Sequence, residues 1–424
     1  MASPEAKNSI PPNLFRQNTK MKLRIFFAIH YLELGGAEIS LIGLLQAIDY
    51  SRYDVDLFVY SHQGELMRQI PKSVNLLPEI PAYAYIERPM KDALCKGLFG
   101  VVYGRLKAKC MFKQYLKHNH PKDGSAIFQY VINGVEPYLP SLHRFGEYDL
   151  AVSFLTPHNI VLNKVRTKRK ACWIHTDYSK IDVNAELELP VWRGYDHIVS
   201  ISPDVTKAFL SVFPSLKDKM VEIHNILSAD FVRNRAEEIS PEEVSKEMPR
   251  EENVINLLSV GRFTHPKNYD NVPDILKNIN GNVKWYLIGY GGDEPLIRQR
   301  ITEAGMEGKV IILGKKENPY PYIKACDIYV QPSRYEGNAV TVREAQILGK
   351  PVVVTNYPTA NSQIQDGTDG IIVPLENKGC AEGIARFLQD KAHQRCIINY
   401  LRNHDYSNIS EINKLYHLLH SQSV

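Results

Sequence analysis

The sequence predicts an α/β protein of two doubly wound, Rossmann-like domains that face each other across a cleft. Short apolar runs alternate with helix-like segments in both halves of the chain, which is the pattern of parallel sheets covered by helices. Several of these runs end at glycine-containing polar loops, the places where such sheets bind ligands. The length of 424 residues allows two domains of ordinary size, each with its own core.

Four segments are expected along the chain. Residues 1–20 lack an apolar h-region, so they predict a loose leader and no signal peptide. Residues 21–228 should form the first domain and residues 229–400 the second. Residues 401–424 should form a helix that ends the second domain or crosses back to the first. Between the two domains, residues 233–253 are rich in glutamate and broken by prolines, which predicts a surface excursion rather than core.

The composition excludes several classes of protein. Lys and Arg total 51 against 47 for Asp and Glu, so the net charge of +4 is too small to indicate nucleic acid as a partner. The six cysteines include no C-x-x-C pair, which argues against a zinc site or a disulfide scaffold and indicates a reducing, cytoplasmic compartment. No apolar run reaches about 18 residues, the length needed to span a membrane.

The first strand is predicted at residues 23–29, and Gly35 and Gly36 then open a helix over residues 37–47. A helix N-terminus behind a glycine pair suits an anion, although a tight turn between strand and helix explains the same residues. A second strand is predicted at residues 55–60. Asp54 and Asp56 mimic a D-x-D metal motif, but they lie at the start of that strand, away from the ligand-binding ends, so we expect no metal site.

Residues 88–122 are strongly basic, with nine Lys or Arg against a single Asp, and apolar residues recur between the charges with a helical period. Two interpretations remain open. A basic helix with an apolar stripe can lie on an anionic membrane surface. Alternatively, a soluble helix packs its stripe on the core and turns its lysines outward.

Further strands are predicted at residues 148–154, 170–174 and 198–202. His175 directly follows the strand at 170–174, where α/β sheets bind ligands. The alternative is a loop histidine that is satisfied by backbone groups.

In the second half, a strand at residues 254–260 leads into Gly261, Arg262 and Lys267. Two cations five residues apart after a glycine turn can clamp a diphosphate, the Arg as a fork and the Lys as a point charge. They would also stabilise the charge that grows on a leaving diphosphate. A solvated basic loop is the alternative. The strand at 310–313 ends at Gly314, a position expected near a bound base.

Residues 326–354 read as strand, polar loop, helix and strand, with the helix expected over residues 339–348. Glu336 lies in the loop, and Glu344 follows eight residues later, on nearly the face that starts the helix and roughly 12 Å along its axis. The N–H groups of Gly337, Asn338 and Ala339 are expected to be unpaired at the helix start and to suit a phosphate. The alternative is that Glu336 caps the helix and Glu344 is a solvated charge.

The segment SRYEGNAVTVREAQILGKPVVVTNYP, together with the earlier S-V-G-R-F and K-N, resembles the donor-binding signature of the retaining family-4 glycosyltransferases, which have the GT-B fold. The resemblance runs from about residue 21 to about residue 388. It implies that Glu336 meets the donor sugar and that Glu344 holds the ribose. It also places His175 near the sugar, Gly35 and Gly36 near the phosphates, and Gly289 by the nucleotide. After the Glu336-Gly337 pair, the family usually has an apolar or aromatic residue and then Pro, whereas this chain has Asn338 and Ala339. This departure bears on which sugar is transferred.

These observations predict a retaining glycosyltransferase that moves a sugar from a nucleoside diphosphate sugar, with UDP favoured, to a glycan acceptor in polysaccharide biosynthesis. A lipid-linked acceptor would fit the basic stretch at 88–122 and a peripheral position at the inner face of the cell membrane. The expected catalytic residues are Glu336, His175, Arg262 and Lys267, without a cofactor or metal. The second domain would bind the donor and the first would face the acceptor. The rival hypotheses are a sugar-nucleotide epimerase of related fold and a non-catalytic nucleotide-sugar-binding module.

Overall fold

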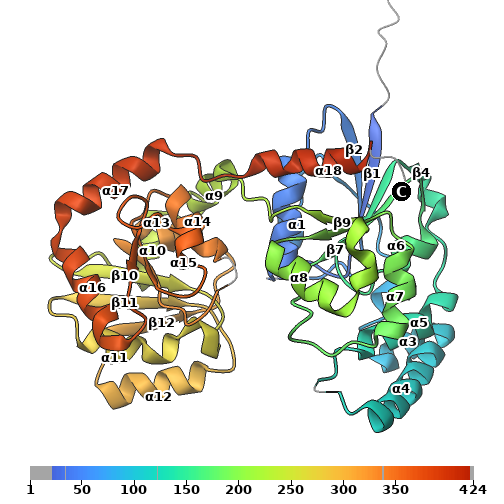
Figure 1. The fold of residues 1–424 in the computed structure, drawn as a ribbon, viewed down its shortest axis with the longest axis horizontal. Coiled ribbons are helices and arrows are strands. Elements are labelled where there is room, and N and C mark those ends of the chain that lie inside the picture. Colours follow the sequence, from blue (N-terminus) through green and yellow to red (C-terminus); the bar gives the residue numbers. More distant parts are fainter. Residues whose placement is uncertain (1–21, 34, 122, 337–338, 421–424) are drawn as a thin grey trace, which may run out of the picture.

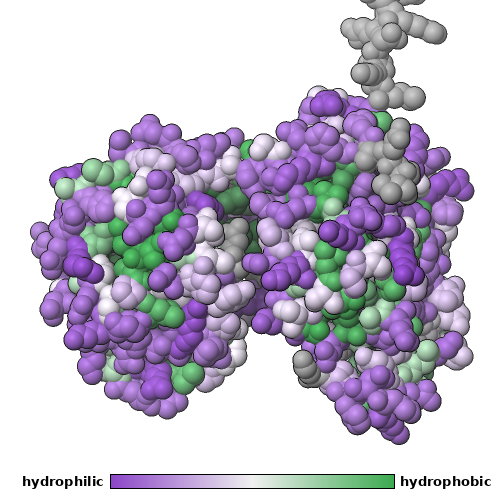
Figure 2. Space-filling view, viewed as in Figure 1, coloured by the Kyte–Doolittle hydropathy of each residue, from purple (hydrophilic) through white to green (hydrophobic). Residues whose placement is uncertain are grey.

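The computed structural model describes residues 22–33, 35–121, 123–336 and 339–420. They form two lobes, each a parallel sheet with helices on both faces (Figure 1). The predicted α/β class with two doubly wound sheets is therefore confirmed. The space-filling view shows a hollow between the lobes, which are joined along one side (Figure 2). The leader predicted at residues 1–20 lies outside the described residues.

The first sheet has the strand order β3-β2-β1-β5-β7-β8-β9, and every neighbouring pair is parallel. Its strands are β1 (Leu23–Ile29), β2 (Tyr53–Val59), β3 (Asn75–Leu76), β5 (Leu150–Ser153), β7 (Lys170–Ile174), β8 (His197–Ser200) and β9 (Met220–Glu222). These strands are almost continuously apolar because helices cover both faces of the sheet. The strand order reverses direction between β1 and β5, so the crevice at their carboxyl ends is the expected ligand site of this lobe.

The helices of the first lobe are α1 (Gly36–Ala47), α2 (Pro81–Ala84), α3 (Met90–Cys95), α4 (Phe99–Asn119), α5 (Ile127–Val135), α6 (Asn159–Lys164), α7 (Ala185–Arg193) and α8 (Pro203–Val212). A small parallel ribbon of β4 (Glu147–Tyr148) and β6 (Arg166–Thr167) completes it. Figure 1 shows α3, α4 and α5 together at the end of the lobe that lies farthest from the joined side.

The second sheet has the order β12-β11-β10-β13-β14-β15, again parallel throughout. Its strands are β10 (Ile255–Val260), β11 (Val283–Ile288), β12 (Val310–Gly314), β13 (Ile328–Gln331), β14 (Val352–Thr355) and β15 (Ile371–Val373). Its helices are α11 (Val272–Lys277), α12 (Glu294–Ala304), α13 (Tyr320–Ala325), α14 (Val340–Ile347), α15 (Ala360–Gln363) and α16 (Asn377–Gln389). Here the order reverses between β10 and β13, which brings the loops after Val260 and after Gln331 together.

The charged stretch at 233–253 is mostly exposed, as predicted, but it also contributes a few residues to the core. It contains the second half of α9 (Ala229–Ala236) and all of α10 (Pro241–Glu247). Ala236, Val244 and Met248 are buried in the core of the second lobe. The apolar residues are few, but helical spacing gathers them on the inner faces while the glutamates point outward.

The last helices connect the two lobes. Ile397 and Leu401 of α17 (Lys391–Asn403) pack into the second core, whereas Leu415 of α18 (Ile412–Leu418) packs into the first. The ring of Tyr416 stacks on that of Tyr53, with centroids 4.4 Å apart. The chain therefore returns to the first lobe at its end, as Figure 1 shows along the joined side.

Candidate active site

Two loops of the second lobe are bound to each other at the carboxyl ends of β10 and β13. Arg334 forms a two-pronged ion pair with Asp270, with N–O distances of 2.7 and 2.8 Å. Its backbone N–H donates to the Pro266 carbonyl at 2.8 Å. The buried amide of Asn268 donates to the Pro332 carbonyl at 2.8 Å. The loop that carries Lys267 is thus held against the loop that carries Glu336.

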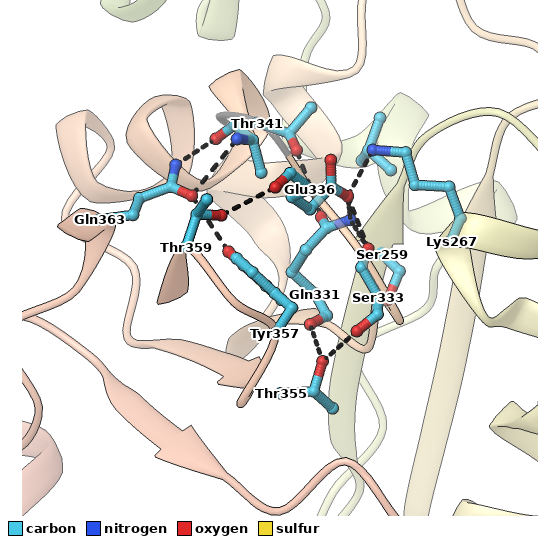
Figure 3. Close-up of polar contacts among 12 residues, drawn as sticks. Ser259, Lys267, Gln331, Ser333, Glu336, Thr341, Thr355, Tyr357, Thr359 and Gln363 are labelled. Carbon is cyan, nitrogen blue, oxygen red and sulfur yellow. Dashed lines mark hydrogen bonds and ion pairs between the residues drawn. The ribbon is translucent and has the colours of Figure 1, made fainter. Parts of the chain in front are cut away.

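Lys267 and Glu336 form an ion pair in this region, with Nζ 2.6 Å from Oε1 (Figure 3). The same carboxylate oxygen accepts hydrogen bonds from Ser333 Oγ at 2.6 Å and Gln331 Nε2 at 2.9 Å. Thr359 donates to the Glu336 carbonyl at 2.8 Å. Among the described residues all bonds to this carboxylate end on Oε1, so Oε2 is left for another partner. A buried carboxylate fixed on one oxygen is suited to meet a ligand with the other.

A cavity of about 270 Å³ lies between the lobes; we call it the cleft cavity. The predicted residues among its lining are Gly36, Gly261, Arg262, Gly289 and Glu344. They come from α1 in the first lobe and from three separate segments of the second. Lys267, Glu336 and His175 do not line it.

A wider hollow of about 850 Å³ shares five lining residues with the cleft cavity: Gln69, Phe231, Arg235, Lys316 and Glu317. None of the predicted site residues lines this hollow, so we place the candidate site in the smaller cavity.

Glu344 is buried on α14, with 5% of its surface exposed, and Tyr320 donates a hydrogen bond to its Oε1 at 2.8 Å. Burial raises the pKa of Glu344 to about 7, and the hydrogen bond from Tyr320 opposes that rise. The predicted helical relation to Glu336 is wrong, because α14 begins only at Val340. Glu344 lies little more than one turn into the helix, so its place relative to Glu336 is set by the loop.

The anion cradle predicted at the start of α14 is also different. Gly337 and Asn338 lie outside the described residues. The N–H of Ala339 is not unpaired, since it donates to Gln363 Oε1 at 3.3 Å, and Gln363 Nε2 donates back to the Ala339 carbonyl at 2.6 Å (Figure 3). Of the three backbone N–H groups predicted to bind an anion, the structure describes only that of Ala339. This N–H already donates to Gln363.

Two predicted glycines serve close packing of the loops. Gly289 has a φ of +153°, and a side chain there would overlap the carbonyl oxygen of Gly261. The Gly289 N–H donates to the Gly314 carbonyl at 3.0 Å. At Gly261 a Cβ would crowd the Tyr269 hydroxyl and touch the Lys267 chain. These glycines bring the ends of β10, β11 and β12 together, which shapes the cavity wall.

Gly35 and Gly36 of the first lobe have different surroundings. The carboxylate of Glu38, which is 7% exposed, occupies the space that a side chain at Gly35 would need. Burial raises the pKa of Glu38, while the charge of Arg262 in the other lobe acts to lower it. Gly36 has open space beside it and lines the cleft cavity. Gly36 and Arg262 thus line the same cavity from opposite lobes.

His175 lies directly after β7, with its ring 4.7 Å from that of Phe154. Burial lowers the pKa of His175 to about 3, so the imidazole is neutral at physiological pH. Its Nε2 is buried and finds no hydrogen-bond partner in the described part of the chain.

The rejected D-x-D motif has a structural use. Asp56 accepts hydrogen bonds from Arg24, Asn75 and Tyr148 at 2.5–2.9 Å. Within the described ranges, no group of three His, Cys, Asp or Glu could hold a metal ion.

Sequence reasoning missed four side chains that hold the site together: Tyr320, Gln331, Ser333 and Gln363. Gln331 carried the clearest signal, because a polar residue ends an otherwise apolar strand at a ligand-binding edge. Tyr320 and Gln363 gave no such signal, since each acts on a residue 24 positions away.

Comparison with known proteins places this site in context. Residues 241–404 match the family model described as "Glycosyl transferases group 1". The chain is 28% identical over 133 residues to the lipopolysaccharide core biosynthesis glycosyltransferase LpsE of Rhizobium meliloti, a match that covers 31% of this chain and 38% of LpsE.

A second relative is the N-acetylgalactosamine-N,N'-diacetylbacillosaminyl-diphospho-undecaprenol 4-alpha-N-acetylgalactosaminyltransferase of Campylobacter jejuni. It is 27% identical over 136 residues, which is 32% of this chain and 37% of that protein. The matched part of the chain thus spans less than two fifths of either relative.

Among solved structures, Anabaena Alr3699/HepE in complex with UDP and glucose aligns with a TM-score of 0.63 at 18% identity. The alignment covers 94% of this chain and all of that one. At this identity the likeness shows the fold alone, and that fold is GT-B, as predicted.

Proposed function

We propose that this chain is a retaining glycosyltransferase of the family-4 type, which moves a sugar from a UDP-linked donor to a glycan acceptor in polysaccharide biosynthesis. The observation that carries the proposal is the Lys267–Glu336 pair, held at the switch point of the second sheet beside a cavity lined by Arg262 and Glu344. The family match over residues 241–404 and the relatives in lipopolysaccharide and undecaprenol-linked glycan assembly support it.

Each residue has a role that follows from its surroundings. Arg262 has an exposed guanidinium at the cavity wall, where it can bind the diphosphate and stabilise its charge as it leaves. Glu344, once ionised, accepts hydrogen bonds from the ribose hydroxyls. Lys267 holds Glu336 and adds positive charge near the phosphates. Glu336 offers its free oxygen to the hydroxyls of the donor sugar. His175 faces the sugar from the first lobe as a neutral group.

The reaction balances without a cofactor or metal. The bond between the anomeric carbon and the phosphate oxygen breaks, and the acceptor oxygen forms a bond to the same carbon on the same face. The acceptor proton passes to the leaving phosphate. Arg262 and Lys267 lower the energy of that charge-separated state.

An activity screen with a defined set of donors tests the function. Sugar nucleotides are incubated with and without candidate glycan acceptors, and the products are identified by mass spectrometry. Transfer that requires an acceptor is expected, and Glu336→Ala and Lys267→Ala should each abolish it. Lys324→Ala, which breaks an exposed ion pair with Glu237 elsewhere on the lobe, is the control and should keep full activity.

Each rival gives a different result in the same screen. Conversion of the sugar nucleotide with no acceptor present would indicate an epimerase. Binding that leaves every sugar nucleotide intact would indicate a binding module. Full transfer by both site variants would end the assignment of Glu336 and Lys267.

The acceptor side of the proposal includes a lipid-linked glycan at an anionic membrane surface. Within the described residues no helix is long and apolar enough to cross a membrane. Helix α4 instead has two apolar faces, about half a turn apart. Val101, Gly104 and Ala108 are buried. Phe99, Tyr103 and Leu106, on the opposite face, are 68%, 58% and 48% exposed.

The exposed face of α4 is flanked by four exposed lysines: Lys107, Lys109, Lys113 and Lys117. Apolar side chains between lysines fit the boundary between headgroups and acyl chains of an anionic bilayer. We therefore propose that the enzyme is cytoplasmic and peripheral at the inner face of the membrane.

Co-sedimentation with phosphatidylglycerol vesicles tests this contact. Replacing the four lysines of α4 with Gln should release the protein from the vesicles. The control replaces four exposed lysines of the second lobe, namely Lys277, Lys309, Lys378 and Lys391. Equal sedimentation of the two variants would contradict the membrane contact.

A further inference from the structure

The first lobe contains a separate cavity of about 490 Å³, which we call the first-lobe cavity. Three segments wall it: residues 30–33 after β1, residues 60–63 after β2, and residues 83–92 around α2 and the start of α3. No described residue lines both this cavity and the cleft cavity. It opens at the carboxyl ends of parallel strands, where α/β sheets bind ligands.

Polar contacts between distant segments hold the walls of the first-lobe cavity. His30 Nδ1 lies 2.6 Å from Glu87 Oε1. Arg88 donates to Ser61 Oγ at 2.6 and 3.0 Å and forms an ion pair with Glu79 at 2.8 Å. The arrangement is therefore a built site in which these four side chains, His30, Glu87, Arg88 and Ser61, are oriented before a ligand arrives.

The His30–Glu87 pair retains capacity for a ligand. The side chain of Glu87 is 42% exposed, so a carboxylate oxygen remains accessible beside the one that His30 occupies. The bond to His30 and the charge of Arg105 oppose desolvation and hold the pKa of Glu87 below its ordinary value. Glu87 is thus a carboxylate near neutral pH. His30 Nε2 is buried and has no hydrogen-bond partner among the described residues, as polar groups in unfilled sites often are.

The charges of the first-lobe cavity differ in sign from those of the cleft cavity. Glu33, Glu87 and Asp92 line it, and its only arginine among the described residues, Arg88, is already bonded to Glu79 and Ser61. By contrast, the cleft cavity is lined by four cationic side chains, Arg235, Arg262, Lys315 and Lys316, against two carboxylates, Glu317 and Glu344, so positive charge is in excess. An anionic ligand would be repelled from the first cavity and attracted to the second.

The remaining lining suits a sugar ring. Four tyrosines line the cavity, namely Tyr31, Tyr60, Tyr83 and Tyr85. Flat aromatic side chains pack against the apolar face of a pyranose, and a carboxylate accepts hydrogen bonds from its hydroxyls. A volume of about 490 Å³ is in the range of small-molecule sites.

We propose that the first-lobe cavity binds the terminal saccharide of the acceptor, and that this saccharide is neutral or carries an amine rather than a carboxylate or phosphate. The proposal rests on the proposed transferase function and specifies its acceptor class. Glu87 is the residue that selects for charge, and His30 positions it.

The position of α4 agrees with this assignment. Arg105 of α4 donates to the carbonyls of Tyr85 and Arg88, which belong to the cavity wall. The wall that would hold the saccharide is thus bonded to the helix whose outer face carries the exposed apolar residues and lysines. A lipid-linked acceptor can use both adjoining surfaces.

Saturation-transfer NMR on the full chain tests the proposal with simple methyl glycosides. The probes are the methyl glycosides of glucose, galactose and mannose, methyl glucosaminide and methyl glucuronide. We expect at least one neutral glycoside or the glucosaminide to bind, and the glucuronide to bind about tenfold more weakly or not at all. Glu87→Ala should weaken the neutral glycoside about tenfold. Glu87→Gln should reduce the discrimination against the glucuronide.

Controls separate this proposal from the transferase function. Glu307→Ala, an exposed carboxylate of the second lobe, should change nothing. UDP affinity and the melting temperature, measured on each variant, should match the unmodified chain because Glu87 lies outside the cleft cavity. If the unmodified chain does not bind UDP, that result would instead count against the proposed donor site. Absence of binding by every neutral and amino glycoside, equal binding of the glucuronide, or binding that is insensitive to Glu87→Ala would overturn the acceptor proposal.

Discussion

Glu344→Gln should stabilise the ligand-free protein while weakening its binding of the nucleotide. The carboxyl group is 5% exposed, and burial raises its pKa to about 7 from an ordinary value of 4.5. Glutamine keeps the shape and can still accept the hydrogen bond from Tyr320. The substitution therefore removes a buried charge without removing the packing.

The sign of the pH dependence follows from proton linkage. The pKa of Glu344 is about 4.5 in the unfolded state and about 7 in the folded state. At pH values between these two, the folded protein binds more protons than the unfolded protein, so its stability falls as the pH rises. The destabilisation is absent well below pH 4.5, grows up to pH 7 and is complete above it. It amounts to about 1.5 kcal/mol at about pH 5.5 and about 3 kcal/mol at about pH 8. For a lobe of this size, 3 kcal/mol corresponds to about 6–12 °C in melting temperature.

Thermal unfolding and UDP titration at two pH values give the readout. The gain in melting temperature of Glu344→Gln should be about twice as large at pH 8 as at pH 5.5. UDP affinity at pH 8 should fall about 10- to 100-fold, because a hydrogen bond to a charged group contributes about 1.5–3 kcal/mol. The affinity of the variant is compared with that of the unmodified protein at the same pH, so that the titration of UDP itself affects both values equally. A gain that does not depend on pH, or a loss of stability, would refute the reasoning.

Three further predictions concern other parts of the molecule. Gln363→Ala should lower stability by about 1–3 kcal/mol and weaken UDP binding, because it leaves the Ala339 N–H without a partner among the described residues and leaves the Ala339 carbonyl with only the Val342 N–H; an unchanged melting curve would exclude that role. His175 should show constant imidazole chemical shifts between about pH 5 and pH 8, since burial holds its pKa near 3, and a titration step in that range would contradict the assignment. Gly104→Ala should destabilise the contact of α4 with α5 by about 1–3 kcal/mol, because the new methyl group would meet the Gly134 carbonyl; limited proteolysis of α4 should increase, whereas unaltered cleavage would show that the helices can separate without penalty.

Apolar runs with clear boundaries were the most predictable part of the fold. The predicted strands at 23–29 and 170–174 coincide with β1 and β7 residue for residue. Both are short, are buried except at their first residues and are followed at once by a histidine. The stretch at 233–253 lies mostly at the surface, as predicted, but its many charges gave no indication that Ala236 and Val244 pack into the core.

The site was predictable in its parts but not in its pairings. Glu336, Lys267, Arg262 and Glu344 could be selected as residues that follow strand ends. That Lys267 bonds to Glu336 across 69 positions of sequence depends on β10 and β13 being neighbours in the sheet. That Gln363 takes the N–H of Ala339 depends on how α15 packs beside α14, which no local pattern reveals.

The order of apolar and polar residues by itself determined the class of fold, the ends of most strands and the loops at which chemistry is expected, because these depend on local periodicity. Only the tertiary structure decided which side chains meet, which cavity is cationic and which acidic, and that α4 has a second, exposed apolar face. It also decided the pKa values of Glu344 and His175. Desolvation and electrostatic interactions depend on the atoms within a few ångströms of a group, and most of those atoms come from distant parts of the chain.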